Sequence, residues 1–326
     1  MAESSSAPAS AAPLPTAESQ GGQAVLMNMA FARPLDSGRF YRWCYVSEDG
    51  KREQDLQEGE WLDDQIVPGS VRCDRFERAE TPVADARLLA APASLRREGF
   101  EVLEHADAVP PPDPQDMEPF FRHLSESVRR AMQRSYAREV VAVHVLDHTL
   151  RTAGGAGSGQ AQSVVLEAHA DFTPESGAKR LQSERMQFKL GDERPIPVED
   201  APLLVNVWQP LDTVYRVALA LCDVRSMSSA DLVRKTMYFK GRAGEVFNVK
   251  RNAAQRWYYY RHMRKDEALI FLTWSPDGTM TAHSAVVDPT DAEDAPPRRS
   301  MEVRFAVKFG GEPTAEAAGG PTRPLE

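Results

Sequence analysis

The sequence predicts a mainly β fold with flanking helices, of the sandwich, jelly-roll or barrel type. Its second half is a series of short apolar segments separated by turn residues, which is typical of antiparallel strands. Its first half contains one clearly amphipathic helix. No GxGxxG, P-loop or GxSxG motif stands between a strand and a helix, so nucleotide-binding folds and serine hydrolases are not favoured.

The expected elements follow the chain in a simple order. Short strands and turns are expected over residues 24–104. Apolar residues at helical spacing, from Phe120 to Met132, predict a helix over 116–137. The valine-rich segment 140–150 predicts a buried strand, and residues 153–163 read as a flexible stretch of Gly, Ala and Ser. Later segments are expected as a strand at 164–172, helix and loop at 180–194, and strands at 203–210, 215–222, 268–274, 281–287 and 300–309.

Composition limits the classes of partner and compartment. The chain has 326 residues and a formal net charge of -9, so nucleic acid and anionic membranes are not expected partners. Three cysteines without a CxxC pattern fit a reducing cytoplasm and apolar, buried thiols. No apolar run is long enough for a membrane span. Residues 1–22 and 312–326 read as disordered tails around one domain at 23–311, and the oligomeric state stays open, a homodimer being one option.

A His-x-Asp pair stands in the expected strand 164–172. Side chains alternate across a strand, so His169 and Asp171 point to the same face, while Ala168 and Ala170 point to the other. An imidazole nitrogen and a carboxylate oxygen on one face can bind the same metal ion. One further imidazole would complete a facial triad of two histidines and a carboxylate, which leaves three coordination positions open.

His283 is the best candidate for that third ligand. It lies near the start of an expected late strand, far along the chain from His169 and Asp171. The order His-x-Asp, a long gap and then His is the order used by oxygenases that depend on iron(II) and 2-oxoglutarate. Because the carboxylate of Asp171 is present, no position is vacated for the chloride ion that a related halogenase would bind.

The last expected strand has a polar face that suits a dicarboxylate. Arg298, Ser300, Glu302 and Arg304 share this face, and apolar residues such as Val303 share the other. A guanidinium fork and a hydroxyl two residues apart, Arg298 and Ser300, can hold one end of 2-oxoglutarate. Arg304 is the alternative partner for that carboxylate.

Several stretches together resemble the hydroxylase/desaturase family of CmcJ- and AsaB-type proteins, which includes gibberellin desaturase-like proteins. The resemblance runs from about Ala24 to Phe309. The stretches that carry it are Pro82–Arg87, Glu98–Phe100, Asp147–Arg151, Asn206–Leu211, Ala218–Asp223, Trp257–Tyr259, Asp266–Ala268 and Pro297–Arg304.

This resemblance implies a double-stranded β-helix, that is, a jelly-roll, cupin-like core. It also implies hydroxylation or desaturation of a small natural-product molecule, with iron(II) bound by His169, Asp171 and His283. 2-Oxoglutarate and O2 would be co-substrates, and an iron(IV)-oxo species would be the oxidant. The chain departs from the family at Gln209, where Arg is usual, and at Phe172, where a polar residue is usual. It also has Ala-His-Ser-Ala-Val around His283 in place of Pro-His-Thr-Ala-Phe, and none of these changes removes a ligand.

Five further residues are candidates for the surroundings of the metal. Asn206 could bind the C1 carboxylate of 2-oxoglutarate, orient the substrate, or be satisfied by backbone. Trp208 shares its strand face. His148, Tyr259 and Phe172 are candidate pocket residues, although His148 and Tyr259 also fit structural roles. The glycine-rich stretch Gly154–Gly159 is a candidate lid over the entrance.

Two other functions remain open from the sequence alone. A cupin-like dioxygenase or isomerase could use the same triad without 2-oxoglutarate. A jelly-roll binding protein would use neither iron nor 2-oxoglutarate. Arg298 distinguishes them, since only the 2-oxoglutarate-dependent enzyme needs a guanidinium for the distal carboxylate.

Overall fold

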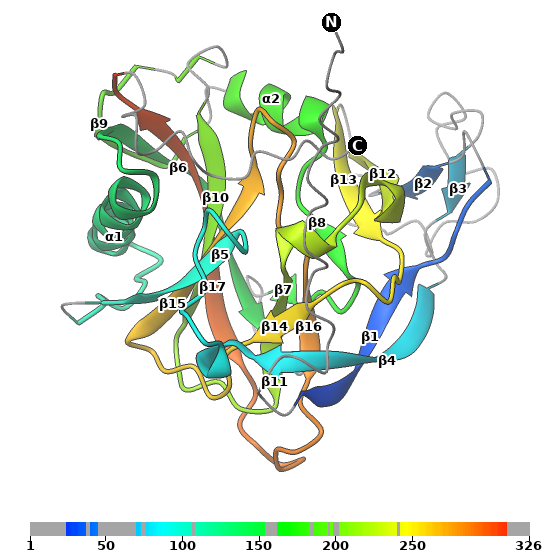
Figure 1. Ribbon diagram of the computed structural model, residues 1–326. Helices are drawn as coiled ribbons and strands as arrows, with labels where there is room; N and C mark the ends of the chain where they lie inside the picture. The colour runs from blue at the N-terminus through cyan, green and yellow to red at the C-terminus, as the bar shows by residue number, and fades with distance from the viewer. Residues whose placement is uncertain are drawn as a thin grey trace, which may run out of the picture.

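The computed structural model describes residues 24–36, 40–44, 70–72, 76–105, 108–153, 162–182, 186–194, 196–197, 202–239 and 242–311. The expected tails, 1–22 and 312–326, and the expected lid, Gly154–Gly159, lie outside these residues. Two sheets form most of the described part and face each other across a common interior (Figure 1). The predicted mainly β, jelly-roll class is thereby confirmed.

The larger sheet carries two of the three expected metal ligands. Ten strands form it, in the order β1-β4-β14-β11-β16-β8-β13-β12-β2-β3. Their bounds are β1 Val25–Ala32, β4 Phe76–Asp85, β14 Trp257–Tyr259, β11 Val217–Cys222, β16 His283–Val287, β8 His169–Ala170, β13 Arg242–Val249, β12 Leu232–Phe239, β2 Phe40–Cys44 and β3 Ser70–Arg72.

The smaller sheet supplies the polar groups that face those ligands. Its order is β5-β15-β10-β17-β6-β7, with β9 added beside β6. The strands are β5 Phe100–Glu104, β15 Glu267–Trp274, β10 Leu203–Pro210, β17 Arg299–Phe309, β6 Val140–Thr152, β7 Gln162–Ser163 and β9 Phe188–Gly191. Short 3-10 helices occur at Ala86–Leu88, Val224–Ser226 and Ser229–Asp231.

Helix α1, Glu118–Tyr136, covers the outer face of the smaller sheet (Figure 1). Its apolar stripe, including Leu124 and Val128, packs with Val205, Val207 and Val303 in one buried cluster. Residues on the other face of β10 and β17 therefore point into the interior, because strand side chains alternate. The two faces of β17 that the sequence predicted are those observed.

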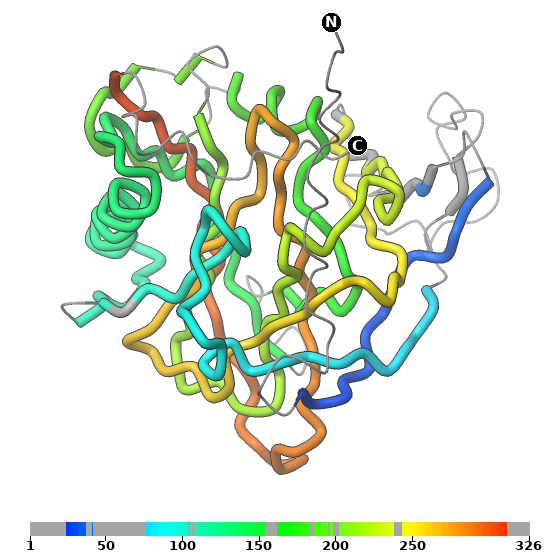
Figure 2. The backbone as a smooth tube through the Cα atoms, in the orientation of Figure 1, coloured from blue at the N-terminus to red at the C-terminus, as the bar shows by residue number. Residues whose placement is uncertain are grey.

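A second apolar cluster joins the two sheets inside the molecule. Phe100, Trp208 and Phe271 of the smaller sheet pack with Leu221 and Tyr258 of the larger one. Figure 2 shows the green segment that contains β8 and the orange segment that contains β16 running side by side at the centre. The site therefore lies between two sheets that are held together by buried aromatic side chains.

The regular strands agree closely with the expected ones, and the irregular parts do not. The strand expected at 164–172 is reduced to the two residues of β8, flanked by single bridges such as Ala30 to Glu167. The described part of the region 180–194, expected as helix and loop, contains only the end of α2, which spans Pro174–Gln182, and then the strand β9, which was not expected. Strands β12 and β13 were not expected at all. They form a hairpin that pairs over eight residues, but their mixed polar sequence has no strand pattern from which it could be predicted.

Gly177 in α2 offers a test of this packing. A Cβ atom there would lie 2.2 Å from Cδ1 of Trp274, whose Nε1 donates to the carbonyl of Pro174 at 3.1 Å. Helix propensity alone predicts that Gly177→Ala stabilises the protein by about 1 kcal/mol. We expect the opposite, a loss of about 1–3 kcal/mol in the free energy of unfolding, because Trp274 is 4% exposed and cannot move aside. Urea denaturation of Gly177→Ala, with the exposed-site variant Lys179→Ala as control, shows whether the free energy of unfolding rises or falls.

Two smaller expectations concern the cysteines and membranes. Cys222 is buried, and burial raises the pKa of its thiol to about 12, which fits an unreactive core residue. The side chains of Cys44 and Cys73 lie outside the described residues. Among the described helices, none is long and apolar enough to cross a membrane.

Candidate metal centre

The local backbone explains why His169 and His283 meet. His169 lies directly opposite His283 of β16 and, on the other side, opposite Asn248 of β13. Directly opposed residues of an antiparallel pair project to the same face with their Cβ atoms about 5 Å apart. The two imidazole rings accordingly lie with their centroids 4.3 Å apart. This juxtaposition depends on strand pairing rather than on any local sequence pattern.

Asp171 completes a compact group of three ligands. Its Oδ1 lies 3.6 Å from Nε2 of His169 and 3.8 Å from Nε2 of His283. One ligand atom from each residue lies within 4.8 Å of the others. Two imidazoles and one carboxylate are the donor set of non-haem iron(II) oxygenases, so the chemistry of the three side chains fits the metal that the sequence predicted.

Hydrogen bonds at the far side of each ring orient the histidines. Nδ1 of His169 lies 2.7 Å from the carbonyl of Glu167, and Nδ1 of His283 lies 3.3 Å from the carbonyl of Thr281. A carbonyl can only accept, so each Nδ1 carries the proton and each Nε2 keeps a lone pair toward the metal position.

The electrostatics also favour metal-binding protonation states. Burial, reinforced by His283, lowers the pKa of His169 to about 3, so the ring is neutral near pH 7. Burial alone would raise the pKa of Asp171, but Arg304 and the two histidines hold it well below its ordinary value. Both groups are therefore deprotonated, as metal ligands must be.

A second group of buried donors lies on the same interior face of β10 and β17. Arg298 is 3% exposed, and its guanidinium carbon lies 5.3 Å from the ring centroid of Trp208. Nη1 of Arg298 donates to the carbonyl of Ala218 at 3.2 Å. Among the described residues, Nε of Arg298, Oγ of Ser300 and Nε1 of Trp208 have no hydrogen-bond partner. Buried, unsatisfied donors of this kind indicate a binding site for an anion.

Arg304 and Asn206 are placed differently from these donors. The Nε atom of Arg304 donates to Oδ2 of Asp171 at 3.1 Å, and its two terminal nitrogens donate to Glu302 and Asp147. Nδ2 of Asn206 donates to the same Oδ2 at 2.7 Å and to Glu302 at 3.0 Å. Both side chains therefore support Asp171. The sequence placed Glu302 on this face without assigning it a role; strand alternation was the only signal for it.

The candidate pocket residues are not all brought together. His148 lies on the outer face of the smaller sheet, with its ring centroid 5.4 Å from that of Phe121 in α1. Tyr259 donates to Asp288 at 2.9 Å within an apolar cluster of the larger sheet. Phe172 follows Asp171 directly and packs against the cluster that contains Trp274 and Leu204. Of these three, Phe172 alone adjoins a metal ligand in the chain.

Gln209, the departure from the family pattern, also lies away from the metal. It is paired across the sheet with Met301, which belongs to the outer cluster under α1. Its Nε2 donates to the carbonyl of Lys265 at 2.9 Å, and His105 lies 2.8 Å from its Oε1. The replacement of the usual Arg is accommodated by local hydrogen bonds outside the metal centre.

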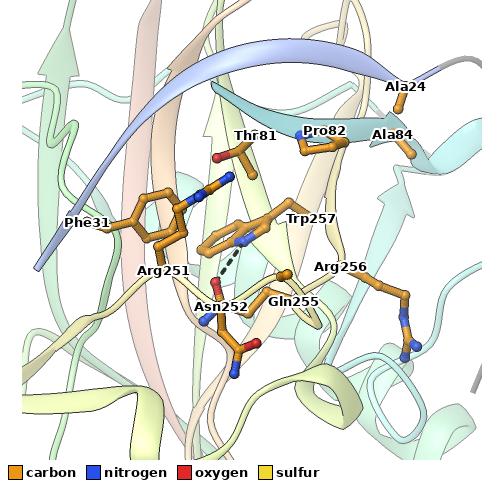
Figure 3. A pocket seen from close by; sticks show the side chains of 11 residues that line it. Ala24, Phe31, Thr81, Pro82, Ala84, Arg251, Asn252, Gln255, Arg256 and Trp257 are labelled. Carbon is orange, nitrogen blue, oxygen red and sulfur yellow. Dashed lines mark hydrogen bonds between the residues drawn. The ribbon is translucent and has the colours of Figure 1, made fainter. Parts of the chain in front are cut away.

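A shallow cavity of about 80 Å³ lies elsewhere, beside β1, β4 and β14. Figure 3 shows Trp257 among the side chains that line it, with Nε1 directed at Oε1 of Gln255, 3.4 Å away. None of the three metal ligands lines this cavity. The residues that line it are Ala24, Phe31, Thr81, Pro82, Ala84, Arg251, Asn252, Ala253, Gln255, Arg256 and Trp257.

The fold matches solved structures of iron and alpha-ketoglutarate-dependent enzymes, and three of its side chains could hold a metal ion, as in the jelly-roll class of iron- and 2-oxoglutarate-dependent oxygenases. A family model described as "Oxidoreductase/YMDC permease-like domain" matches residues 41–308. The chain belongs to this family.

Relatives and solved structures agree with that assignment. Hydroxylase/desaturase efuI of Hormonema carpetanum is 26% identical over 273 residues, which cover 74% of this chain and 88% of efuI. Hydroxylase/desaturase asaB of Aspergillus flavus is 34% identical over 130 residues, which are 34% of this chain and only 57% of asaB. The structure of the iron and alpha-ketoglutarate-dependent endoperoxidase NvfI matches with a TM-score of 0.64 at 22% identity, over 88% of this chain and 98% of NvfI. The resemblance to AsaB-type proteins is confirmed.

Proposed function

We propose that this protein is an iron(II)- and 2-oxoglutarate-dependent oxygenase that hydroxylates or desaturates a small molecule. The observation that carries the proposal is the pairing of two features in one interior. A His-Asp-His ligand set suits iron, and a buried arginine beside a serine and a tryptophan has donors left over for an anion. A metal-binding jelly roll that used no 2-oxoglutarate would have no need for the second feature.

In this proposal His169, Asp171 and His283 hold the iron through Nε2, Oδ1 and Nε2. When bound, iron with 2-oxoglutarate and O2 supplies the power to remove hydrogen from an unactivated C–H bond, with succinate and CO2 as co-products. Arg298 and Ser300 hold the distal carboxylate of 2-oxoglutarate, and Trp208 closes the pocket over the guanidinium. The apolar groups around them exclude water.

Arg298 is better placed for this role than Arg304. Each nitrogen of the Arg304 guanidinium already donates to a carboxylate, Nε to Asp171, Nη1 to Asp147 and Nη2 to Glu302. Burial, followed by Arg151, lowers the pKa of Arg298 to about 10, although Glu302 acts in the opposite direction. A carboxylate ligand would relieve the unfavourable burial of this charge.

The substrate class is inferred from the names of the relatives. Besides efuI and asaB, they include "Aspirochlorine biosynthesis protein N" of Aspergillus oryzae, 32% identical over 141 residues. We infer a natural-product substrate of low molecular mass. Phe172, apolar beside Asp171, favours an apolar group of the substrate next to the metal.

Turnover of 2-oxoglutarate tests the proposal. The purified protein with iron(II), O2 and 2-oxoglutarate is expected to form succinate slowly even without its substrate, as NMR can measure. Removal of iron with EDTA, or the change Asp171→Ala, is expected to reduce succinate to the level of a protein-free control. Equal consumption of 2-oxoglutarate by wild type and Asp171→Ala would contradict the proposal.

A further inference from the structure

A charged network lies behind the metal ligand Asp171. Three carboxylates, those of Asp171, Glu302 and Asp147, all contact Arg304. Two more arginines close the network, since Arg151 pairs with Glu302 and Arg180 pairs with Asp147, each at 3.2 Å. Three negative and three positive groups therefore balance one another in a largely buried region.

The register of the smaller sheet builds this network. Asn206 of β10 lies opposite Phe271 of β15 and opposite Arg304 of β17. Arg304 in turn lies opposite Asp147 of β6. Directly opposed residues share a face, so Asn206, Arg304 and Asp147 form one row across three strands. The larger sheet brings Asp171 to that row.

The two oxygens of Asp171 have different surroundings. Oδ1 faces the histidines, at 3.6 Å from Nε2 of His169. Oδ2 receives two hydrogen bonds, from Asn206 at 2.7 Å and from Nε of Arg304 at 3.1 Å. Both donors are themselves fixed, because each also donates to Oε1 of Glu302.

We propose that Asn206 and Arg304 are positioning residues that restrict Asp171 to binding iron through Oδ1 alone and keep Glu302 away from the metal. A carboxylate can bind with one oxygen or with both, and a second oxygen would occupy a coordination position that a bidentate co-substrate needs. Glu302 is 6% exposed and belongs to the same network, so without Arg304 it becomes a competing ligand, even though Arg151 still pairs with it. The proposal rests on the proposed function and assigns Asn206 and Arg304 to the metal ligand, not to 2-oxoglutarate.

The geometry excludes the simpler role for Asn206, which is to bind 2-oxoglutarate through its amide nitrogen. One amide nitrogen carries two hydrogens, and Asn206 directs one to Asp171 and one to Glu302. No hydrogen remains for the C1 carboxylate of 2-oxoglutarate. Glu302 is occupied in the same way, with Oε1 accepting from Asn206 and Arg304 and Oε2 accepting from Arg151 at 3.2 Å.

The test compares iron binding with 2-oxoglutarate binding in Arg304→Gln and Asn206→Leu. Iron(II) is still expected to bind both variants, because the three ligands remain. The dissociation constant of 2-oxoglutarate, from anaerobic visible titration, is expected to rise about 10–100-fold, an effect of the same size as the one that loss of a partner of a metal ligand has on metal affinity or activity. The EPR spectrum of the nitric oxide adduct of the iron protein, recorded without 2-oxoglutarate, is expected to change its rhombicity because the ligand set changes.

Two further variants separate positioning from general damage. Arg180→Gln removes a charge at the far end of the network and is expected to leave both readouts unchanged. Glu302→Gln in the Arg304→Gln background removes the competing carboxylate and is expected to restore part of the 2-oxoglutarate affinity. If Arg304→Gln does not fold, Asn206→Leu carries the test, since it removes the donor without changing the charge.

The outcomes distinguish this inference from the proposed function. A wild-type protein that binds iron but gives no visible band with 2-oxoglutarate contradicts the proposed function. In that case the EPR spectra of the nitric oxide adducts of the variants still test the positioning role. A normal wild type together with folded Asn206→Leu and Arg304→Gln proteins that match it in 2-oxoglutarate affinity and in EPR spectrum overturns the inference alone.

Discussion

His169→Ala is expected to abolish the weak visible absorption band that the wild-type protein develops anaerobically with iron(II) and 2-oxoglutarate. The band arises only when 2-oxoglutarate chelates bound iron. His169 supplies one of three protein ligands, oriented by the bond of its Nδ1 to Glu167. Loss of a ligand is expected to weaken iron binding by more than the roughly 100-fold that loss of a supporting partner causes.

His148→Ala is the matched control for that experiment. It also removes one imidazole, but from the outer face of the smaller sheet, where the ring contacts Gln187 and Phe121. The control is expected to keep the full band and the iron content of the wild type. A band that survives in His169→Ala, or that is lost equally in His148→Ala, would show that the metal is held elsewhere.

The positions of several strands could be predicted because each strand has its own local sequence pattern. Strand β10 matches the expected range, and β6, β15 and β17 begin or end within two residues of theirs. Each is a run of apolar or alternating residues long enough to define a period. Helix α2 lacks such a pattern: Gly177 lowers its helix propensity, and its packing against Trp274 comes from elsewhere in the chain.

In the candidate site, too, some features could be predicted from local sequence and others could not. Alternation placed His169 and Asp171 on one face, and the short β8 keeps that arrangement. The meeting of His169 with His283 depends on strand register between distant segments, which spacing cannot encode. The hydrogen-bond partners of Asn206 could not be predicted for the same reason, since its two acceptors come from β17 and from the segment that follows β8. Local sequence reveals which groups share a face, and tertiary structure decides what they face.

Arg298→Met is expected to produce the second large effect, a strong loss of 2-oxoglutarate binding with iron binding retained. Hydrogen bonds to a charged group contribute about 1.5–3 kcal/mol each, so loss of a two-bond contact weakens binding by on the order of 100-fold or more. Visible titration of 2-oxoglutarate against the iron protein measures this. Arg299→Ala is the control, because the neighbouring Arg299 is exposed and pairs with Asp212 at 3.2 Å.

Arg298→Met is also expected to stabilise the protein when no ligand is bound. Burial lowers the pKa of Arg298 to about 10, below its ordinary 12.5, so the folded state disfavours the charged form that is present near pH 7. That penalty lies on the folded state at every pH below about 10 and fades as pH rises toward 12.5. An apolar side chain of similar length removes it, so the melting temperature of ligand-free Arg298→Met is expected to exceed that of the wild type. A structural arginine would behave in the opposite way: its loss would lower the melting temperature and leave 2-oxoglutarate affinity unchanged, and that pair of results would remove Arg298 from the site.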